Sequence, residues 1–201
     1  MTGASKTMRA AALVLAACLL AGACGGGGGG GSGGGGDGGG ERSVLQPGER
    51  KPTGMRVTSS AFAADQAVPE RFSCEGDNVP PPLRWEGTPR GTTELAVVVE
   101  DPDAPNGTFV HWVVVGIDPG TTSMEPETPP PGAEVLPGSS DNATYVGPCP
   151  PDGSGTHRYF FEVYALPRRP ELPEGAAPLE KVRTIREAAS AGGWLVGTFT
   201  R

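Results

Sequence analysis

The sequence predicts a mainly β domain, an antiparallel β-sandwich with one C-terminal helix and long ordered loops. Three observations support this fold class. Several apolar segments have the length of strands and are rich in β-branched and aromatic residues. Stretches rich in proline and glycine separate these segments. Only one segment, near the C-terminus, has apolar residues at helical spacing.

The expected domain covers residues 55–201, and its first part is rich in loops. Residues 62–72 predict an edge strand followed by a turn at Pro69-Glu70. Three consecutive prolines at 80–82 precede a short strand at 83–85. We therefore expect only short strands before residue 90.

The core strands come next. The continuous apolar runs 95–99 and 109–117 predict two buried strands, and the aromatic run 158–166 predicts a third. Residues 118–144 contain proline, glycine and serine throughout, which predicts a long ordered excursion or a flexible flap.

One helix and one strand complete the prediction. Pro178 suits the first position of a helix, and Gly192-Gly193 are expected to end it. Residues 194–200 then predict the last strand. The helix carries an apolar stripe formed by Leu179, Val182, Ile185 and Ala189.

The N-terminus predicts export and attachment to a membrane. Residues 1–23 contain a basic start and an apolar run too short to span a bilayer, followed by small residues and Cys24. This pattern resembles a bacterial lipoprotein signal peptide, in which acyl chains such as palmitate on Cys24 would anchor the protein. Plain secretion without lipid is the alternative. Residues 24–54, nearly all glycine up to 40, predict a disordered tether that holds the domain at the extracytoplasmic face of the cell membrane.

The charge argues against two classes of partner. The net charge is −7, and the chain has no cluster of lysine and arginine. Such a surface is unsuited to nucleic acids or to anionic lipid surfaces.

The chain has only two histidines, and both begin apolar strands. His111 follows the proline-stiffened acidic loop 101–105, and strict alternation along its strand would place it on one face with Val113 and Val115. His157 and Tyr159 share a face of another strand. One interpretation is that the aspartates and histidines form a site that binds a polar or phosphoryl head group. A turn whose aspartates cap backbone amides, with His111 packed in the sheet, is the other.

A rigid loop precedes the second histidine. Residues 147–151 (Gly-Pro-Cys-Pro-Pro) are incompatible with regular secondary structure. They predict a rigid loop that packs against its neighbour as a preformed wall. His157 and Tyr159 are able to donate hydrogen bonds to anionic oxygens, and the amides of residues 153–156 are suited to an anion-binding nest. A simple connector is the alternative.

These segments together resemble the phosphatidylethanolamine-binding protein family, in its bacterial branch described as Raf-kinase-inhibitor-like. The resemblance rests on residues 74–85, 101–105, 109–114, 145–151 and 155–161. It implies a β-sandwich of a large and a small sheet, with a small pocket that accepts an anion or a phospholipid head group. It also implies that the pocket residues are Asp101, His111, Pro151, His157 and Tyr159, with Asp103 and Gly147 supporting the wall.

The chain departs from the family pattern in two places. The family often has a glycine-histidine pair in its C-terminal helix, where this chain has Arg186-Glu187-Ala188-Ala189. Residues 138–145 also contain less glycine and fewer aromatic residues than is usual. A pocket wall contributed by the helix is therefore not expected.

Cys74 and Cys149 are the cysteines that remain in the expected mature domain apart from Cys24. Both would flank the implied pocket, and an exported protein meets an oxidising environment. They predict either a disulfide or two buried free thiols.

The preferred hypothesis is a non-catalytic binding domain for a small anionic or phosphorylated group, without metal or cofactor. One rival is a hydrolase in which Ser154, His157 and Asp101 form a triad, although the sequence shows neither a strand-to-helix elbow nor an oxyanion hole. A metal site is a second rival, but its residues lack close metal-ligand spacing: His111, His157, Asp101 and Cys149. A third rival is a partner-binding or regulatory module with a vestigial pocket.

Overall fold

The computed structural model describes residues 54–126 and 129–201. The expected signal peptide, the lipidation site Cys24 and almost all of the tether lie outside these residues. The larger sheet has six strands, in the order β2 (Gln66–Ala67), β9 (Ala191–Phe199), β8 (His157–Leu166), β4 (Glu94–Asp101), β5 (Phe109–Ile117) and β7 (Glu134–Leu136). The smaller sheet has three strands, in the order β1 (Arg56–Thr58), β3 (Leu83–Glu86) and β6 (Ser123–Met124).

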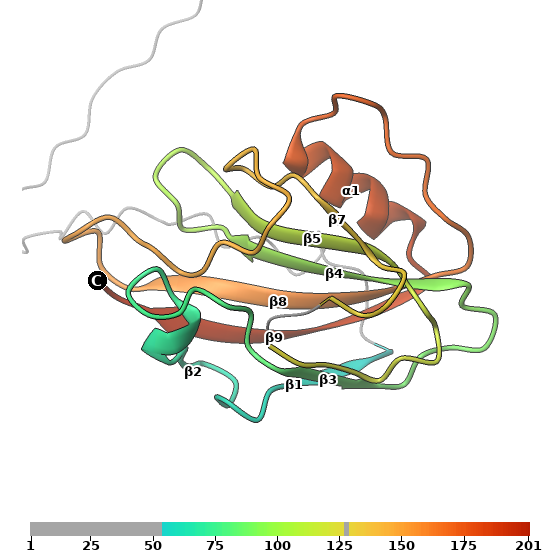
Figure 1. The fold of residues 1–201 in the computed structure, drawn as a ribbon, viewed down its shortest axis with the longest axis horizontal. Coiled ribbons are helices and arrows are strands. Elements are labelled where there is room, and N and C mark those ends of the chain that lie inside the picture. Colours follow the sequence, from blue (N-terminus) through green and yellow to red (C-terminus); the bar gives the residue numbers. More distant parts are fainter. Residues whose placement is uncertain (1–53, 127–128) are drawn as a thin grey trace, which may run out of the picture. The chain divides into compact units, whose positions relative to one another are not determined.

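The two sheets face each other, which confirms the mainly β sandwich. Figure 1 shows β1 and β3 below the larger sheet, with helix α1 (Pro178–Ala188) on the opposite side. All the pairings are antiparallel except that of β2 with β9. The core between the sheets is filled by alternate residues of the central strands, among them Val97, Val99, Phe161 and Val163.

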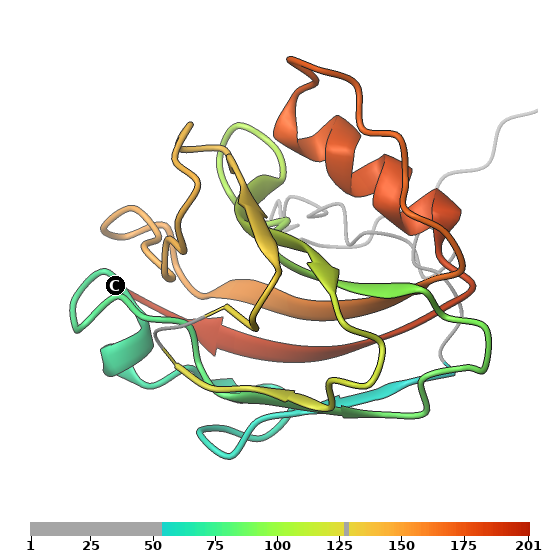
Figure 2. The same cartoon turned by 45° about the vertical axis from the view of Figure 1, so that its right-hand side comes forward.

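Helix α1 lies against the larger sheet, as the rotated view of Figure 2 shows, and a second core fills the space between them. Val182 and Ile185 of the predicted apolar stripe are fully buried there. The guanidinium of Arg186 is buried in the same core. Arg186 of α1 donates from Nη2 to Glu100 at 2.6 Å and to Glu162 at 3.0 Å, and from Nε to the hydroxyl of Tyr164 at 2.9 Å. We call these four residues the sealed cluster.

The predicted boundary between helix and last strand was wrong. The helix ends at Ala188, and Gly192 and Gly193 belong to β9. A Cβ on Gly192 would lie 2.8 Å from the ring of Tyr164, and one on Gly193 would collide with the backbone of Met55. These glycines therefore permit close packing within the sandwich, and they do not terminate the helix.

The excursion at 118–144 is more regular than its composition indicates. It contributes β6 to the smaller sheet and β7 to the edge of the larger sheet. Its closing segment is held to β5, because the amide of Ser139 donates to the carbonyl of Val110 at 2.8 Å and the Ser139 hydroxyl accepts from the amide of Val110 at 2.9 Å.

Candidate functional site

A cavity of about 190 Å³ lies where the loops after β4 and before β8 meet the start of β5. Most of its wall is apolar, and the polar side chains in it are a carboxylate and both histidines. The lining residues are Asp101, Ala104, Pro105, Phe109, His111, Val146, Cys149, Pro150, Pro151 and His157. The structure thus brings together four of the residues that the family resemblance implied, Pro151 among them.

His157 is the most constrained side chain of this cavity. Its Nδ1 lies 2.7 Å from Oδ2 of Asp101, and its Nε2 lies 3.0 Å from the hydroxyl of Ser154. Both His157 and Asp101 are buried, at 2% and 3% exposure. The other carboxylate oxygen of Asp101 accepts the amide of Asp103 at 2.8 Å. The aspartate therefore caps the turn, as one sequence-based interpretation expects, and at the same time orients the imidazole of His157.

His111 reaches the cavity through a β-bulge. Val99 pairs with Trp112 and Glu100 pairs with Val110, so that His111 is an extra residue in β5. Val113 and Val115 lie in the core under α1, whereas His111 lines the cavity. The predicted common face of these three residues was therefore wrong, because strict alternation fails at a bulge.

The environment of His111 favours its neutral form. Burial lowers the pKa of His111, and this effect outweighs the bond to Val146 and the charge of Asp101, which raise the pKa. The Nδ1 of His111 lies 2.7 Å from the carbonyl oxygen of Val146. Because a carbonyl only accepts, Nδ1 carries the proton, and Nε2 is the ring nitrogen that is left for a ligand.

Tyr159 lies behind the histidine. Its ring contacts the ring of His111 edge-on, with 5.3 Å between the centroids. The side chain is fully buried, and its hydroxyl has no hydrogen-bond partner in the part of the chain that the structure describes. Burial raises the pKa of Tyr159, and the charge of Asp101 raises it further, so the hydroxyl keeps its proton. We call Asp101, His111, His157 and Tyr159 the cavity cluster.

Asp103 and Gly147 do not line the cavity, but both hold its surroundings. Asp103 accepts two side-chain hydrogen bonds from Arg158, each at 2.8 Å. Burial by itself raises the pKa of Asp103, but the hydrogen bonds and charge of Arg158 outweigh it and lower the pKa. The amide of Gly147 donates to Asn78 at 2.7 Å, and a Cβ at this position would collide with the carbonyl of Phe72.

A disulfide ties the cavity wall to the segment after the short 3₁₀ helix at Glu70–Phe72. Cys149, which lines the cavity, is bonded to Cys74, 75 residues away in the sequence. The amide of Cys74 also donates to the carbonyl of Pro148 at 3.1 Å. Of the two expectations for these cysteines, the structure has the disulfide.

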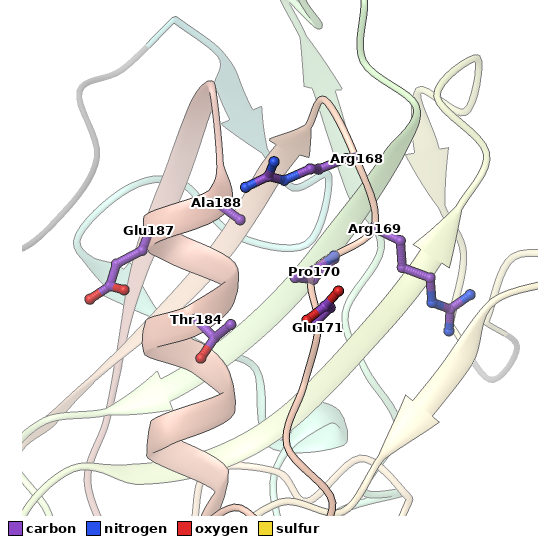
Figure 3. Close-up of a pocket in the computed structure, with 7 residues that line it drawn as sticks. All are labelled: Arg168, Arg169, Pro170, Glu171, Thr184, Glu187 and Ala188. Atoms are coloured by element: carbon purple, nitrogen blue, oxygen red, sulfur yellow. The ribbon is translucent and has the colours of Figure 1, made fainter.

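A larger groove, of about 500 Å³, lies between α1 and the loop after β8. Figure 3 shows Arg168 extending toward Ala188 at the end of the helix, whereas Arg169 points away from it. Arg169 donates to Glu134 at 2.8 Å, and both of these side chains are exposed. This groove is open and carries charges of both signs, so it is the weaker candidate for a binding site.

The described residues show neither a metal-binding cluster nor a membrane-spanning helix. Residues 54–126 and 129–201 contain no group of three or more histidine, cysteine or acidic side chains placed to hold a metal ion. In the same ranges, no helix has the length and apolar character needed to cross a membrane.

Comparison with known proteins identifies the family. A sequence model of the phosphatidylethanolamine-binding protein family matches residues 58–200. The chain belongs to this family. The match covers every strand from β2 to β9 and every residue of the cavity cluster.

Relatives and solved structures agree with this assignment. A Mycobacterium tuberculosis protein named as lipoprotein LppC is 46% identical over 145 residues, which are 72% of this chain and 72% of the relative. The UPF0098 protein Rv1910c of the same species is 44% identical over 150 residues, or 74% and 72% of the two chains. The crystal structure of YbcL from E. coli, described as a member of the mammalian family, matches with a TM-score of 0.69 and 27% identity over 74% of this chain and 99% of YbcL.

Proposed function

We propose that the domain binds a small anionic or phosphorylated group, such as a phospholipid head group, in the cavity lined by Asp101, His111 and His157. The observation that carries this proposal is a pair of groups left without polar partners in a preformed site. Only Nδ1 of His111 forms a well-aligned hydrogen bond among the described residues, and the buried hydroxyl of Tyr159 lies near Asp101 without a well-aligned bond to it. Buried polar groups normally have hydrogen-bond partners, so an orphan pair beside a cavity suggests that a ligand supplies them.

Binding of an anion would require His111 to gain a proton. With Nδ1 committed to Val146, neutral His111 offers only a lone pair at Nε2. The imidazolium form would donate from Nε2 and would supply the positive charge that offsets Asp101. Proton uptake and anion binding are then coupled, so affinity rises as the pH falls toward the pKa of the free His111.

The rigidity of the wall supports the same function. Three prolines, at 105, 150 and 151, line the cavity, and the disulfide fixes Cys149 beside them. A preformed wall lowers the entropy cost of binding a small ligand. This proposal needs no catalytic step, metal or cofactor.

A thermal-shift screen tests the proposal. Phosphate, acetate, phosphoethanolamine and nucleotides are added to the wild-type domain, to His157→Ala and to Ser60→Ala, which changes an exposed serine. We expect at least one anion to raise the melting temperature of wild type and Ser60→Ala, and to have no such effect on His157→Ala. The absence of any anion-dependent shift in the wild type would instead favour a partner-binding module with a vestigial pocket.

We further propose that Cys24 carries acyl chains that anchor the protein to the extracytoplasmic face of the cell membrane, with residues 24–54 as the tether. The signal-like residues 1–23 and the lipoprotein name of the LppC relative support this proposal. Incorporation of radiolabelled palmitate tests it. Label in the wild type that is lost in Cys24→Ala is the expected result, and equal label in both would refute acylation at this residue.

A further inference from the structure

Asp101, His157 and Ser154 form a linear hydrogen-bonded series at the edge of the cavity. The two joining distances are 2.7 Å, from Oδ2 of Asp101 to Nδ1 of His157, and 3.0 Å, from Nε2 of His157 to Oγ of Ser154. A serine that only filled space beside the cavity would not need this alignment. The order carboxylate, imidazole, hydroxyl is the order required to activate a nucleophile.

The hydrogen-bond pattern also fixes the relevant tautomer. An ionised carboxylate only accepts, so Asp101 keeps a proton on Nδ1 of His157. Neutral His157 then has its lone pair on Nε2, directed at the hydroxyl of Ser154. Because Asp101 is itself held by the amide of Asp103, the imidazole is oriented from behind as a general base.

Ser154 lies on a tight turn next to the cavity wall. Its amide donates to the carbonyl of Pro151 at 3.0 Å, and the glycines on both sides have positive φ angles of 74° and 86°. Pro151 and His157 both line the cavity, and Ser154 is half-buried. The amide of Gly155, the residue next to Ser154, donates to no acceptor within the described ranges.

The cavity suits a short uncharged chain. Its wall includes Ala104, Phe109 and Val146, and its volume of about 190 Å³ limits it to a small group. The carboxylate of Asp101 disfavours a second negative charge in the same space unless a histidine is protonated. A neutral acyl group of a few carbon atoms therefore fits this wall while both histidines are neutral, whereas an anion requires His111 to be protonated.

We propose that Ser154 is a nucleophile toward carboxylic esters with short acyl chains. Its oxygen attacks the carbonyl carbon, and its proton passes to Nε2 of His157. The bond to the leaving alcohol breaks, and the alcohol takes that proton. Water then repeats the sequence on the acyl-serine, which releases the acid and restores Ser154. This activity goes beyond the proposed anion binding and departs from the non-catalytic function that the sequence favours.

Covalent labelling tests the proposal. An alkyl fluorophosphonate is incubated with the wild-type domain, Ser154→Ala and Ser60→Ala, and the adducts are located by peptide mass spectrometry. We expect one adduct, at Ser154, formed equally in wild type and Ser60→Ala and absent from Ser154→Ala. A wild type that acquires no adduct at Ser154 would overturn the proposal.

A second variant separates a nucleophile from a serine that only supports His157. Asp101→Asn should slow labelling of Ser154 by about 100-fold or more, because the general base loses its orientation. A circular-dichroism melt confirms that this variant is folded. Hydrolysis of p-nitrophenyl acetate should follow the same order, and turnover that persists in Ser154→Ala would contradict the proposal. The anion screen does not depend on this reaction, so each proposal is able to fail alone.

Discussion

Strands β4 and β8 carry two polar clusters on opposite faces of the larger sheet. Asp101 and His157 of the cavity cluster lie at the cavity beside the loops after β4 and before β8. Glu100 and Glu162 of the sealed cluster face α1. Adjacent residues 100 and 101 thus contribute carboxylates to different chemistries, because side chains alternate across a strand. The two clusters differ in the basic side chain that accompanies their carboxylates, which is arginine in the sealed cluster and histidine in the cavity cluster. A guanidinium is always charged and holds a helix to the sheet, whereas an imidazole is able to change its charge and respond to a ligand.

The sealed cluster should matter most for stability. Replacing Arg186 with leucine leaves Glu100 and Glu162 buried without their cation, which typically costs about 3–5 kcal/mol of unfolding free energy. Arg183→Leu changes an exposed arginine of the same helix and should cost less than about 0.5 kcal/mol. Urea denaturation measures both. Similar losses for the two variants would show that the cluster does not hold the helix.

The disulfide should rank next. Removal of Cys74–Cys149 by the double serine variant releases a long loop, and such losses are typically about 2–4 kcal/mol. Chemical denaturation of the double variant, compared with wild type under oxidising conditions, gives the value. Addition of a reductant should lower the unfolding free energy of the wild type to that of the variant. If reductant left the wild-type midpoint unchanged, the bond would be unimportant for stability.

His111 should give a smaller effect that depends on pH. The pKa of His111 in the folded state lies below its ordinary value near 6.5, so the unfolded chain binds its proton first. Stability should therefore fall as the pH drops below about 6.5, and level off below the folded-state pKa. His111→Gln removes this part of the pH dependence. Urea denaturation from pH 8 to 5 measures the unfolding free energy of both proteins. The difference in this free energy between wild type and variant should shrink toward low pH. A constant difference would contradict the buried neutral imidazole.

The exposed ion pair Arg169–Glu134 should matter least. Both side chains are in solvent, so Arg169→Ala should change the unfolding free energy by about 0.2–1 kcal/mol or less. Added salt should reduce even this effect. A loss as large as that of Arg186→Leu would mean that the groove beside α1 contributes to folding in a way that its open geometry does not indicate.

The sequence was sufficient for most of the fold and part of the site. Continuous apolar runs located β4, β5 and β8, because buried central strands leave a strong local pattern. Gly192 and Gly193 were misassigned, since a glycine needed for close approach to Tyr164 looks the same in sequence as one that ends a helix. β6 and β7 were missed within a segment whose composition is that of a loop.

For the site, the resemblance to a family supplied the residues and the structure supplied their positions and contacts. Bulges leave no clear signal in one sequence, so the exposure of His111 to the cavity required the strand register. The sealed cluster was also missed, because Glu100 and Arg186 are 86 residues apart. The sequence makes Ser154, His157 and Asp101 candidates for a hydrolase triad, but only the geometry shows that the three side chains are hydrogen-bonded in that order.

The most direct test of the cavity as an anion site uses the two histidines as their own reporters. Only His111 and His157 contribute imidazole signals to a ¹H–¹³C NMR spectrum of the tag-free domain, and His111→Gln assigns them. Acetate is titrated between pH 6 and 8, where it stays almost fully ionised. We predict a saturable shift of the His111 signal, a raised His111 pKa at saturation and tighter binding at lower pH. Signals and pKa values of both histidines that are unchanged by acetate, phosphate and phosphoethanolamine would contradict the central claim.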